Sequence, residues 1–378
     1  MTLPVFKLEE YLSAREFTAP YMFCSSDIET FAMSDIVKLA DENTKLLWNT
    51  LRLGYTQTQG MPELREVIAD LYEKQIAENI LCFSGAEEGI YCMFHALLQK
   101  QDHVIVITPC YESLASIPKS ICDVTAVELK FEQSWELDLE QIRAAIKPNT
   151  KLIVVNYPHN PTGALLTKAQ QAQLVDIARA HDLWIFSDEV YRGVELDQNL
   201  TLPAFASLYE KAMSLGVMSK AYGMAGLRIG WIACSDTKIL HKMDQHKNYL
   251  SICNSAPSEV LALIALKNSD VILQRNRELL TKNFALLERF MEQHSDILSW
   301  VKPKGGCTAY LKLNENIDSY KFAETMLERT GLLVLPASIY GQNAPCFRIS
   351  FGRANMPEML GIFEQYIQQF RDEHTKAA

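Results

Sequence analysis

The sequence predicts an α/β protein with a mostly parallel sheet that carries helices on both faces, together with a smaller α+β domain. Two observations predict this fold class. Short apolar runs, of the kind found in buried strands, alternate with stretches of helical periodicity between residues 80 and 234. Apolar strands that alternate with helices favour a parallel sheet, because the connecting helices pack on its two faces. Beyond residue 252 this alternation ends.

The strands of the expected sheet are predicted from short apolar runs bounded by polar or turn-forming residues. The run 184–188 shows the pattern, because it begins with three large apolar residues and ends in an aspartate. In order along the chain, the expected strands are 80–83, 103–108, 124–129, 151–156, 184–188, 213–219 and 228–234, and the clearest helices between them are 86–100 and 168–181.

A change of pattern indicates the second domain. A long helical stretch at 271–293 leads to a turn rich in proline and glycine, then to short strands and a final helix at 358–371. We expect residues 45–252 to form the large domain, and residues 1–44 together with 253–378 to form the small one.

Length and composition are those of a large globular chain. With 378 residues, of which 48% are hydrophobic, the chain is long enough for about two domains and a sizeable core. Its net charge of −10 opposes binding to nucleic acid or to an anionic membrane, since both need a basic surface. No apolar run approaches the roughly 18 residues of a membrane span, and residues 1–10 lack a signal-peptide pattern.

The nine cysteines are scattered through apolar segments, without a Cys-x-x-Cys pair or a cluster with histidine. This pattern is typical of buried free thiols rather than of a metal centre or a disulfide framework. We therefore expect a cytoplasmic location and no metal.

Polar and charged side chains stand at the ends of several expected strands. Asp188 closes one apolar run, Lys220 follows another, and Asn160 comes shortly after a third. Arg228 and Arg348 lie beside or within apolar runs. The carboxyl ends of parallel strands meet at one edge of a sheet, where ligands bind, and charges beside hydrophobic strands usually meet each other or an ionic ligand. We therefore expect a shared site for an ionic ligand at this edge.

The residues around Lys220 carry a specific resemblance. The run from Ser219 to Gly230 is similar to the pyridoxal-phosphate lysine signature of the class I/II aminotransferases, the fold type I family typified by aspartate aminotransferase. Further segments resemble this family in the same order, from about residue 55 to the end of the chain: Tyr55 with Gly60 and Arg65, Asn160-Pro161-Thr162-Gly163, Asp188-Glu189-Val190-Tyr191 and Phe347-Arg348-Ile349. The resemblance implies pyridoxal 5'-phosphate as cofactor, and an amino acid and a 2-oxo acid as small-molecule substrates.

The resemblance also implies a task for each matching residue. Lys220 would bind the cofactor as a Schiff base and, once its amine is free, would move a proton between Cα and the cofactor. Asp188 would keep the pyridine nitrogen protonated, although an isolated aspartate at this place is as often a turn cap. Tyr191 and Asn160 would donate hydrogen bonds to the phenolic oxygen of the ring, and Asn160 is also an ordinary turn residue before proline.

Cations and backbone amides would hold the phosphate group. Arg228 would supply a planar guanidinium and Ser219 a hydroxyl. The amides of Gly85, Ala86 and Glu87 open an expected helix and would point at the anion from its positive end. A phosphate in this place would explain an arginine among apolar neighbours.

Three more residues complete the site that the resemblance implies. Tyr111 matches the aromatic side chain that stacks on the cofactor ring, although a lone tyrosine in such a loop is more often part of the core. Arg348, with Asn160, would bind the α-carboxylate of the substrate through a bidentate contact. Tyr55 would reach the phosphate of a neighbouring subunit, which implies a homodimer with shared active sites.

The chain departs from the family pattern at two places. Val217 stands where the family usually has serine or glycine, so one phosphate contact is missing, and Ser219 is the residue that can replace it. The family's glycine-containing substrate loop is replaced by residues 24–30. There, Asp27 and Glu29 are either a solvated acidic loop or recognition groups for a cationic substrate side chain.

A second resemblance keeps the reaction type open. The pair Ser25-Ser26, the run Pro158-His159-Asn160 and residues 305–309 also resemble capreomycidine synthase, a pyridoxal-phosphate enzyme that cyclises a hydroxylated arginine. We expect an aminotransferase that transfers the amino group of an L-amino acid to a 2-oxo acid through Lys220. The alternative is a pyridoxal-phosphate-dependent lyase or cyclase that acts on a substituted amino acid.

Overall fold

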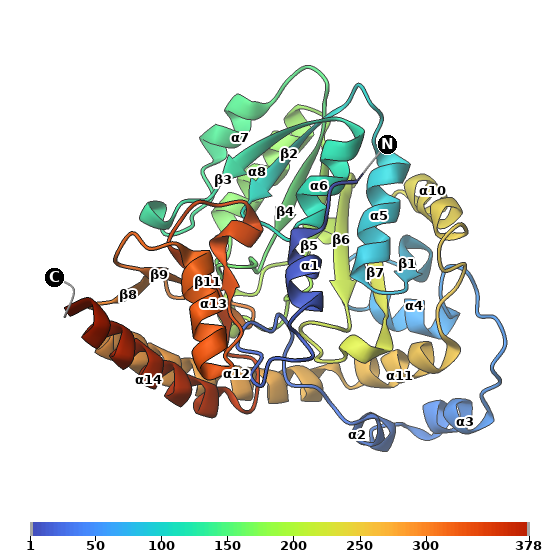
Figure 1. Ribbon diagram of the computed structural model, residues 1–378. Coiled ribbons are helices and arrows are strands. Elements are labelled where there is room, and N and C mark those ends of the chain that lie inside the picture. The colour runs from blue at the N-terminus through green and yellow to red at the C-terminus, as the bar shows by residue number, and fades with distance from the viewer. Residues whose placement is uncertain (1–2, 376–378) are drawn as a thin grey trace.

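The computed structural model describes residues 3–375, and its largest element is a seven-stranded sheet (Figure 1). The strands follow the order β1-β7-β6-β5-β4-β2-β3 across the sheet. Strands β3, β2, β4, β5 and β6 are parallel to one another, whereas β7 runs antiparallel to β6 and to β1. The expected α/β class is confirmed. The strands are β1 Ile80–Phe83, β2 His103–Thr108, β3 Asp123–Glu128, β4 Thr150–Asn156, β5 Trp184–Asp188, β6 Ala212–Val217 and β7 Gly230–Ala233.

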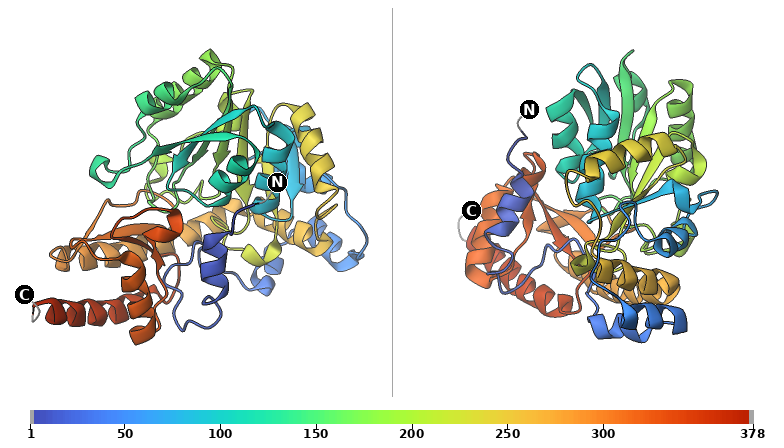
Figure 2. Two further views of the ribbon diagram at one scale, coloured as in Figure 1. Left: turned by 45° about the horizontal axis from the view of Figure 1, so that its top comes forward. Right: turned by 90° about the vertical axis from the view of Figure 1, so that its right-hand side faces the viewer.

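Helices cover both faces of this sheet (Figure 2). Val154 and Phe186 belong to the core on the side of α5 and α6. Ile153 and Ile185 belong to the core on the side of α7 and α8. Because both faces of the central strands are buried, successive residues along them are mostly apolar, which explains the hydrophobic runs in the sequence. One face carries α5 Ala86–Leu97, α6 Ser113–Ile121 and α10 Thr237–Lys247, and the other carries α7 Leu139–Ala145, α8 Lys168–Ala180 and the short α9 Phe205–Leu208.

A second, antiparallel sheet has the strand order β10-β11-β9-β8. Helices before, between and after these strands pack against the sheet. The long helix and the final helix expected from the sequence are both present. The strands are β8 Leu298–Trp300, β9 Thr308–Leu313, β10 Leu335–Pro336 and β11 Cys346–Ser350, and the helices are α12 Ser269–Gln293, α13 Ser319–Thr330 and α14 Met356–Thr375.

The amino-terminal segment is joined to this second sheet. The backbone N–H of Ser350 donates to the carbonyl of Phe23 at 2.7 Å, and the N–H of Glu29 donates to the carbonyl of Gly352 at 2.8 Å. Helix α1 (Lys7–Ser13) lies in front of the junction between the two sheets in Figure 1. Residues near the start of the chain therefore contribute to the region where the two sheets meet.

A further group of helices packs beside the large sheet. Helix α11 contacts α2, α3 and α4, and the group occupies the lower right of Figure 1. The domain boundaries expected after residues 44 and 252 stay a prediction, and the outermost residues of the chain, 1–2 and 376–378, lie outside the described ones. Within residues 3–375, no helix combines the length and the apolar character that crossing a membrane requires. The helices of this group are α2 Met33–Lys38, α3 Glu42–Thr50, α4 Pro62–Ala69 and α11 Ala256–Lys267.

The largest difference from the expected strands lies on either side of Lys220. The strand expected at 213–219 ends at Val217, and the strand expected at 228–234 begins only at Gly230. Arg228 follows a short 3-10 helix and has a φ of 52°, in the left-handed region, which a strand cannot include. Arg228 therefore lies on a connecting loop rather than within a strand, and Lys220 lies on the same loop, after the strand end as expected.

Candidate active site

A cavity of about 290 Å³ lies where β4, β5 and β6 end, between the large sheet, the second sheet and the amino-terminal segment. Residues from all three parts line it, as expected for a ligand site at the carboxyl edge of a parallel sheet. Gly85 lies next to the cavity, and Tyr55 does not line it. The remaining predicted site residues all line the cavity: Ala86, Glu87, Tyr111, Asn160, Asp188, Tyr191, Ser219, Lys220, Arg228 and Arg348.

Lys220 follows β6 and turns its amine into the cavity. Its Nζ donates a hydrogen bond to Oγ of Ser26 at 2.6 Å. Burial lowers the pKa of the Lys220 ammonium, and the nearby Asp27 carboxylate opposes this effect. A lysine with a lowered pKa is more readily neutral, and therefore more able to act as a nucleophile or a base.

Asp188 is the last residue of β5 and only 5% of its surface is exposed. Its Oδ1 accepts a hydrogen bond from the backbone N–H of Val190 at 3.2 Å. Burial raises the pKa of this carboxyl to about 7. A buried carboxylate is stabilised by a cation in contact with it, so the end of β5 is suited to a positively charged ring nitrogen.

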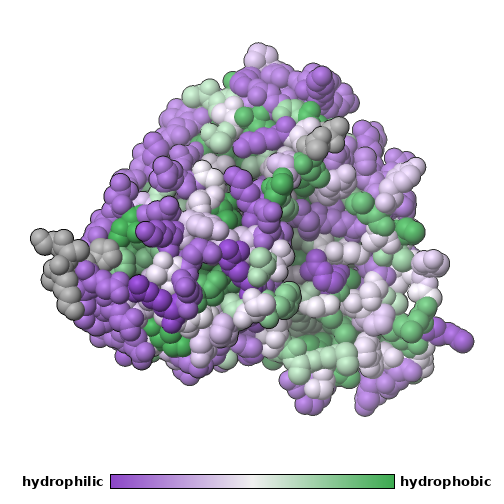
Figure 3. Space-filling model, viewed as in Figure 1, coloured by the Kyte–Doolittle hydropathy of each residue, from purple (hydrophilic) through white to green (hydrophobic). Residues whose placement is uncertain are grey.

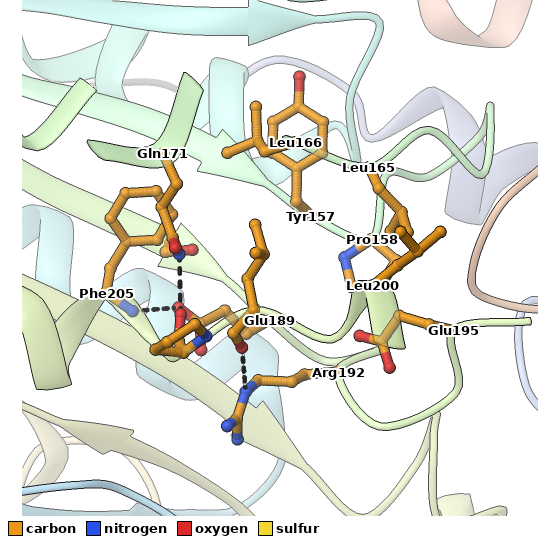
Figure 4. Close-up of a pocket in the computed structure, with 13 residues that line it drawn as sticks. Tyr157, Pro158, Leu165, Leu166, Gln171, Glu189, Arg192, Glu195, Leu200 and Phe205 are labelled. Carbon is orange, nitrogen blue, oxygen red and sulfur yellow. Dashed lines mark hydrogen bonds between the residues drawn. The ribbon is translucent and has the colours of Figure 1, made fainter. Parts of the chain in front are cut away.

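The residue after Asp188 supports the strand end from the other side. Glu189 borders a separate cavity of about 30 Å³ on the face that carries α8 (Figure 4). Its Oε1 accepts hydrogen bonds from the N–H of Phe205 at 2.9 Å and from Oγ of Ser214 at 2.8 Å. The N–H of Arg192 donates to its carbonyl at 2.8 Å. These contacts fix the turn that holds Asp188 at the edge of the sheet.

Arg348 lies on β11 and is 1% exposed. Its Nη1 donates to Oδ1 of Asn160 at 2.9 Å and to the hydroxyl of Tyr340 at 2.7 Å, and its Nη2 donates to the carbonyl of Cys24 at 2.7 Å. Its Nε is buried without a partner among the described residues. Because Arg348 occupies the Asn160 oxygen, the amide of Asn160 keeps its N–H donors for other partners.

Tyr191 is almost fully buried, and its hydroxyl donates to the carbonyl of Ser26 at 2.5 Å. Burial raises the pKa of this phenol well above its usual value, so the hydroxyl keeps its proton. A phenol has one O–H, so Tyr191 can only accept from other groups while it donates to Ser26. The expected hydrogen bond from Tyr191 to the cofactor ring stays a prediction that needs this proton to change partner.

Arg228 and the start of α5 form a site suited to an anion. Gly85 is the N-cap of α5 with a φ of 96°, and a Cβ there would lie 2.3 Å from Nη2 of Arg228. A Cβ on Gly230 would lie 2.9 Å from the N of Ala86. Nη1 of Arg228 reaches Oγ of Ser219 at 3.5 Å. Glycine thus allows the guanidinium to lie over the free amides of the helix, an arrangement that binds phosphate.

One expectation about Arg228 is wrong. The sequence suggested that it sits in an apolar neighbourhood, but its side chain is exposed. The reason is that the loop before β7 turns at Arg228 and directs the residue out of the sheet. Val217, by contrast, lines the cavity as expected and offers no hydrogen bond.

Tyr111 and Glu87 lie near each other in the cavity wall. Tyr111 packs against Phe6 with ring centroids 5.5 Å apart, and its hydroxyl donates to Oε1 of Glu9 at 3.2 Å. Glu87 accepts a hydrogen bond from Oγ of Ser113 at 3.0 Å, and burial raises the pKa of its carboxyl to about 7. Sequence reasoning considered only the backbone amide of Glu87, and the burial of its side chain was missed.

The two acidic residues of the amino-terminal loop have partners within the chain. Nη2 of Arg353 contacts both carboxylate oxygens of Asp27, at 2.8 and 2.9 Å. Oε2 of Glu29 accepts from the N–H of Ala354 at 2.8 Å, and Glu29 is not among the residues that line the cavity. Asp27 does line the cavity, but Arg353 already pairs with its carboxylate, so these contacts favour a structural loop over recognition of a cationic substrate.

Ser26, Cys24 and Tyr340 were not predicted as site residues. Ser26 contacts Lys220 and Tyr191, and the other two contact Arg348. These contacts join residues far apart in the sequence, and no local pattern indicates them. The resemblance of Ser25-Ser26 to a second enzyme was the one signal near them.

The fold and the cavity define a pyridoxal-phosphate enzyme of fold type I. The Lys220 amine that faces the cavity, the buried Asp188 carboxyl and the glycine-bounded anion site beside Arg228 fit the aldehyde, ring nitrogen and phosphate of this cofactor. Residues 22–360 match the family described as aminotransferase class I and II, and the chain belongs to this family, whose cofactor is pyridoxal 5'-phosphate.

Three known proteins show the range of the similarity. The chain is 27% identical over 352 residues to capreomycidine synthase of Streptomyces vinaceus, and the aligned region covers 92% of this chain and 90% of that protein. It is 27% identical over 308 residues to aspartate aminotransferase of Pyrococcus horikoshii, covering 79% of this chain and 78% of that protein. The crystal structure of a pyridoxal-phosphate-dependent aminotransferase from Streptococcus suis has a TM-score of 0.92 at 29% identity, covering 98% of this chain and 99% of that one.

Proposed function

We propose that the protein is an aminotransferase that transfers the amino group of an L-amino acid to a 2-oxo acid. The observation that carries this proposal is the meeting of Lys220, Asp188 and Arg348 in one cavity. These three residues supply a nucleophilic amine, a carboxylate for a ring nitrogen and a cation for a substrate carboxylate. Membership of the aminotransferase class I and II family supports the proposal.

Each residue has a chemical task in this proposal. When bound, the cofactor supplies an aldehyde that combines with amines and a ring that accepts electrons. Lys220 binds it covalently and, once its amine is free, takes the proton from Cα of the amino acid. Asp188 holds a proton on the ring nitrogen. Arg348 binds the α-carboxylate of the substrate.

The remaining residues orient the cofactor and the substrate. Arg228, Ser219 and the amides of Gly85, Ala86 and Glu87 hold the phosphate group at the start of α5. Tyr111 packs against the ring. Asn160 donates its amide hydrogens to the phenolic oxygen of the cofactor ring. Tyr191 donates to the same oxygen when its hydroxyl no longer donates to the Ser26 carbonyl.

We also propose a homodimer in which Tyr55 reaches the active site of the second copy. Tyr55 is 92% exposed, and the neighbouring Leu53 and the loop residue Tyr249 are also exposed. The two loops are adjacent, because Oγ1 of Thr56 donates to the carbonyl of Asn254 at 3.0 Å. Figure 3 shows hydrophobic atoms at the lower right of the molecule, where Figure 1 places α3 and α11. Exposed apolar side chains that lie on adjacent loops are suited to contact with a partner protein.

The nine free cysteines support a reducing compartment, and a cytoplasmic location stays a prediction.

The second candidate function is a pyridoxal-phosphate-dependent lyase or cyclase. Similarity to capreomycidine synthase over 92% of this chain favours it. Both functions begin with loss of the Cα proton to Lys220, so the same residues serve both. They differ afterwards, because a lyase or cyclase expels a β-substituent and needs no 2-oxo acid.

A half-reaction separates the two functions. The purified protein, loaded with pyridoxal phosphate, is screened against the common amino acids without any 2-oxo acid. An aminotransferase releases one 2-oxo acid per active site and then stops until an acceptor is added. Many turnovers without an acceptor would establish the lyase or cyclase instead.

A further inference from the structure

Ser26 contacts two of the residues on which the proposed chemistry depends. Its Oγ accepts a hydrogen bond from Nζ of Lys220 at 2.6 Å, and its carbonyl accepts one from the hydroxyl of Tyr191 at 2.5 Å. It therefore links the amine at the end of β6 to the phenol that follows β5. It belongs to the loop that departs from the family pattern in this chain.

The loop around Ser26 is held by the segment that follows β11, which fixes the position of Ser26. Arg353 binds both carboxylate oxygens of Asp27, the next residue. The neighbouring Gly352 accepts a hydrogen bond from the N–H of Glu29 at 2.8 Å. A Cβ on Gly352 would lie 3.0 Å from the carbonyl of Asp27, so the loop is packed closely against the segment after β11.

The hydroxyl of Ser26 matches what the Lys220 amine needs in both of its protonation states. An ammonium has only donors, and the serine oxygen offers it an acceptor. A neutral amine has a lone pair, to which the serine hydroxyl can donate. The contact can therefore persist while Lys220 takes up a proton and gives it away.

We propose that Ser26 is a positioning residue, which holds the free Lys220 amine in place through its hydroxyl. This inference rests on the proposed function, because in that function Lys220 has a free amine that takes up and releases a proton. It gives the unusual amino-terminal loop a role that does not require contact with a substrate side chain.

The test measures the Lys220 amine in the full-length chain without cofactor. Competitive acetylation over a pH series, with the Lys220 peptide quantified by mass spectrometry, gives the pKa of this amine. The hydrogen bond that the ammonium donates is charge-assisted and therefore stronger than the one that the neutral amine accepts. Ser26→Ala removes both, so we expect the pKa of Lys220 to fall further. Ser26→Thr keeps a hydroxyl and should restore the wild-type value.

Ser25→Ala is the matched control. The Ser25 hydroxyl donates to the carbonyl of Met22 at 3.2 Å and has no contact with Lys220, so this change should leave the pKa of Lys220 unaltered. An unchanged pKa in Ser26→Ala, or equal shifts in Ser25→Ala and Ser26→Ala, would overturn the inference. If Ser26→Ala does not fold, Ser26→Cys gives the same test, because a thiol is a weak acceptor.

A second measurement uses the protein loaded with pyridoxal phosphate. In Ser26→Ala, exchange of the substrate α-proton in D2O should slow about tenfold while KM stays the same. A factor of about ten is a part of the rate enhancement that a well-placed base provides. Borohydride reduction and peptide mapping tell whether the cofactor is bound at Lys220. A label elsewhere would refute the proposed function, whereas a label at Lys220 with an unchanged exchange rate would refute only the role of Ser26.

Discussion

At the scale of single residues, burial moves the proton affinities of Lys220 and Asp188 toward each other. It lowers the pKa of the lysine and raises that of the aspartate to about 7. Neither residue forms an ion pair within residues 3–375. Perturbed titratable groups that share a cavity are typical of catalytic sites. Burial makes the charged form of each group less stable. A bound ligand that places an opposite charge next to the group stabilises that charged form.

The pH dependence of stability tests the burial of Asp188. Between about pH 4 and pH 7, the folded chain keeps this proton while the unfolded chain has lost it. The folded state then binds more protons, so the free energy of unfolding falls as the pH rises, by on the order of 4 kcal/mol for this residue. We expect Asp188→Asn to reduce this slope in the cofactor-free chain, measured by urea unfolding at several pH values.

Two other carboxyls, of Glu87 and Asp182, serve as comparisons for this measurement. Burial also raises the pKa of Glu87 to about 7, so Asp188→Asn should reduce the slope without abolishing it. Asp182 is exposed and its pKa is lowered by a hydrogen bond from Lys211. Asp182→Asn should therefore leave the slope above pH 4 unaltered. A wild-type slope in Asp188→Asn would mean that this carboxyl ionises freely in the folded chain.

At the scale of elements, the start of α5 and the loop before β7 build the anion site together. The helix offers unpaired amides at its first turn, and the loop brings Arg228 over them. Gly85 and Gly230 make the approach possible, because a side chain at either position would collide with the other element. The left-handed conformation of Arg228 is a second adaptation to this geometry.

Gly85→Ala should damage this site in two ways. A φ of 96° is unfavourable for alanine, and we expect a loss of about 1–3 kcal/mol in the free energy of unfolding. The new Cβ also displaces the guanidinium of Arg228. Dissociation of pyridoxal phosphate should then be favoured at least tenfold, as for loss of a charge-assisted contact of about 1.5–3 kcal/mol in Arg228→Ala. Thermal unfolding and cofactor titration measure the two effects.

Gly226→Ala is the control for the same loop. Its backbone does not have a positive φ, and a Cβ there meets no atom within 4 Å. Cofactor affinity and stability should both stay near the wild-type values. Equal losses in Gly85→Ala and Gly226→Ala would show that the loop as a whole, and not the approach of Arg228 to α5, controls cofactor binding.

The elements also show what sequence reasoning can and cannot reach. Strands β1, β2 and β5 have the expected bounds, because residues buried on both faces form continuous apolar runs. The loop from Lys220 to Arg228 was partly assigned to strands, because apolar residues continue past the strand ends. Of the residues in recognised motifs, Lys220, Asp188 and Arg348 line the cavity, whereas Tyr55 does not. Ser26 was not predicted, because its contact with Lys220 spans 194 positions and leaves no periodic signal.

At the scale of the whole molecule, the cavity draws on parts of the chain that are distant in sequence. The large sheet supplies Asp188, and the loop after its strand β6 supplies Lys220. The second sheet supplies Arg348, and the amino-terminal loop supplies Ser26. Hydrogen bonds of Arg348 to Asn160 and to Cys24 join all three parts at one point. A movement of the second sheet relative to the large one would therefore change these contacts of Arg348.

A second copy of the chain would complete this assembly, and a charge placed on the exposed apolar surface tests it. Leu53 is 86% exposed and lies two residues before Tyr55. We expect wild-type protein to sediment as a dimer and Leu53→Glu to sediment as a monomer, because a buried unpaired carboxylate opposes association. Leu200→Glu, at an exposed leucine elsewhere, should remain a dimer. If Tyr55 reaches the partner's phosphate site, Leu53→Glu must also retain pyridoxal phosphate less well than Leu200→Glu. A monomeric wild type that holds its cofactor and is fully active would rule out the shared site.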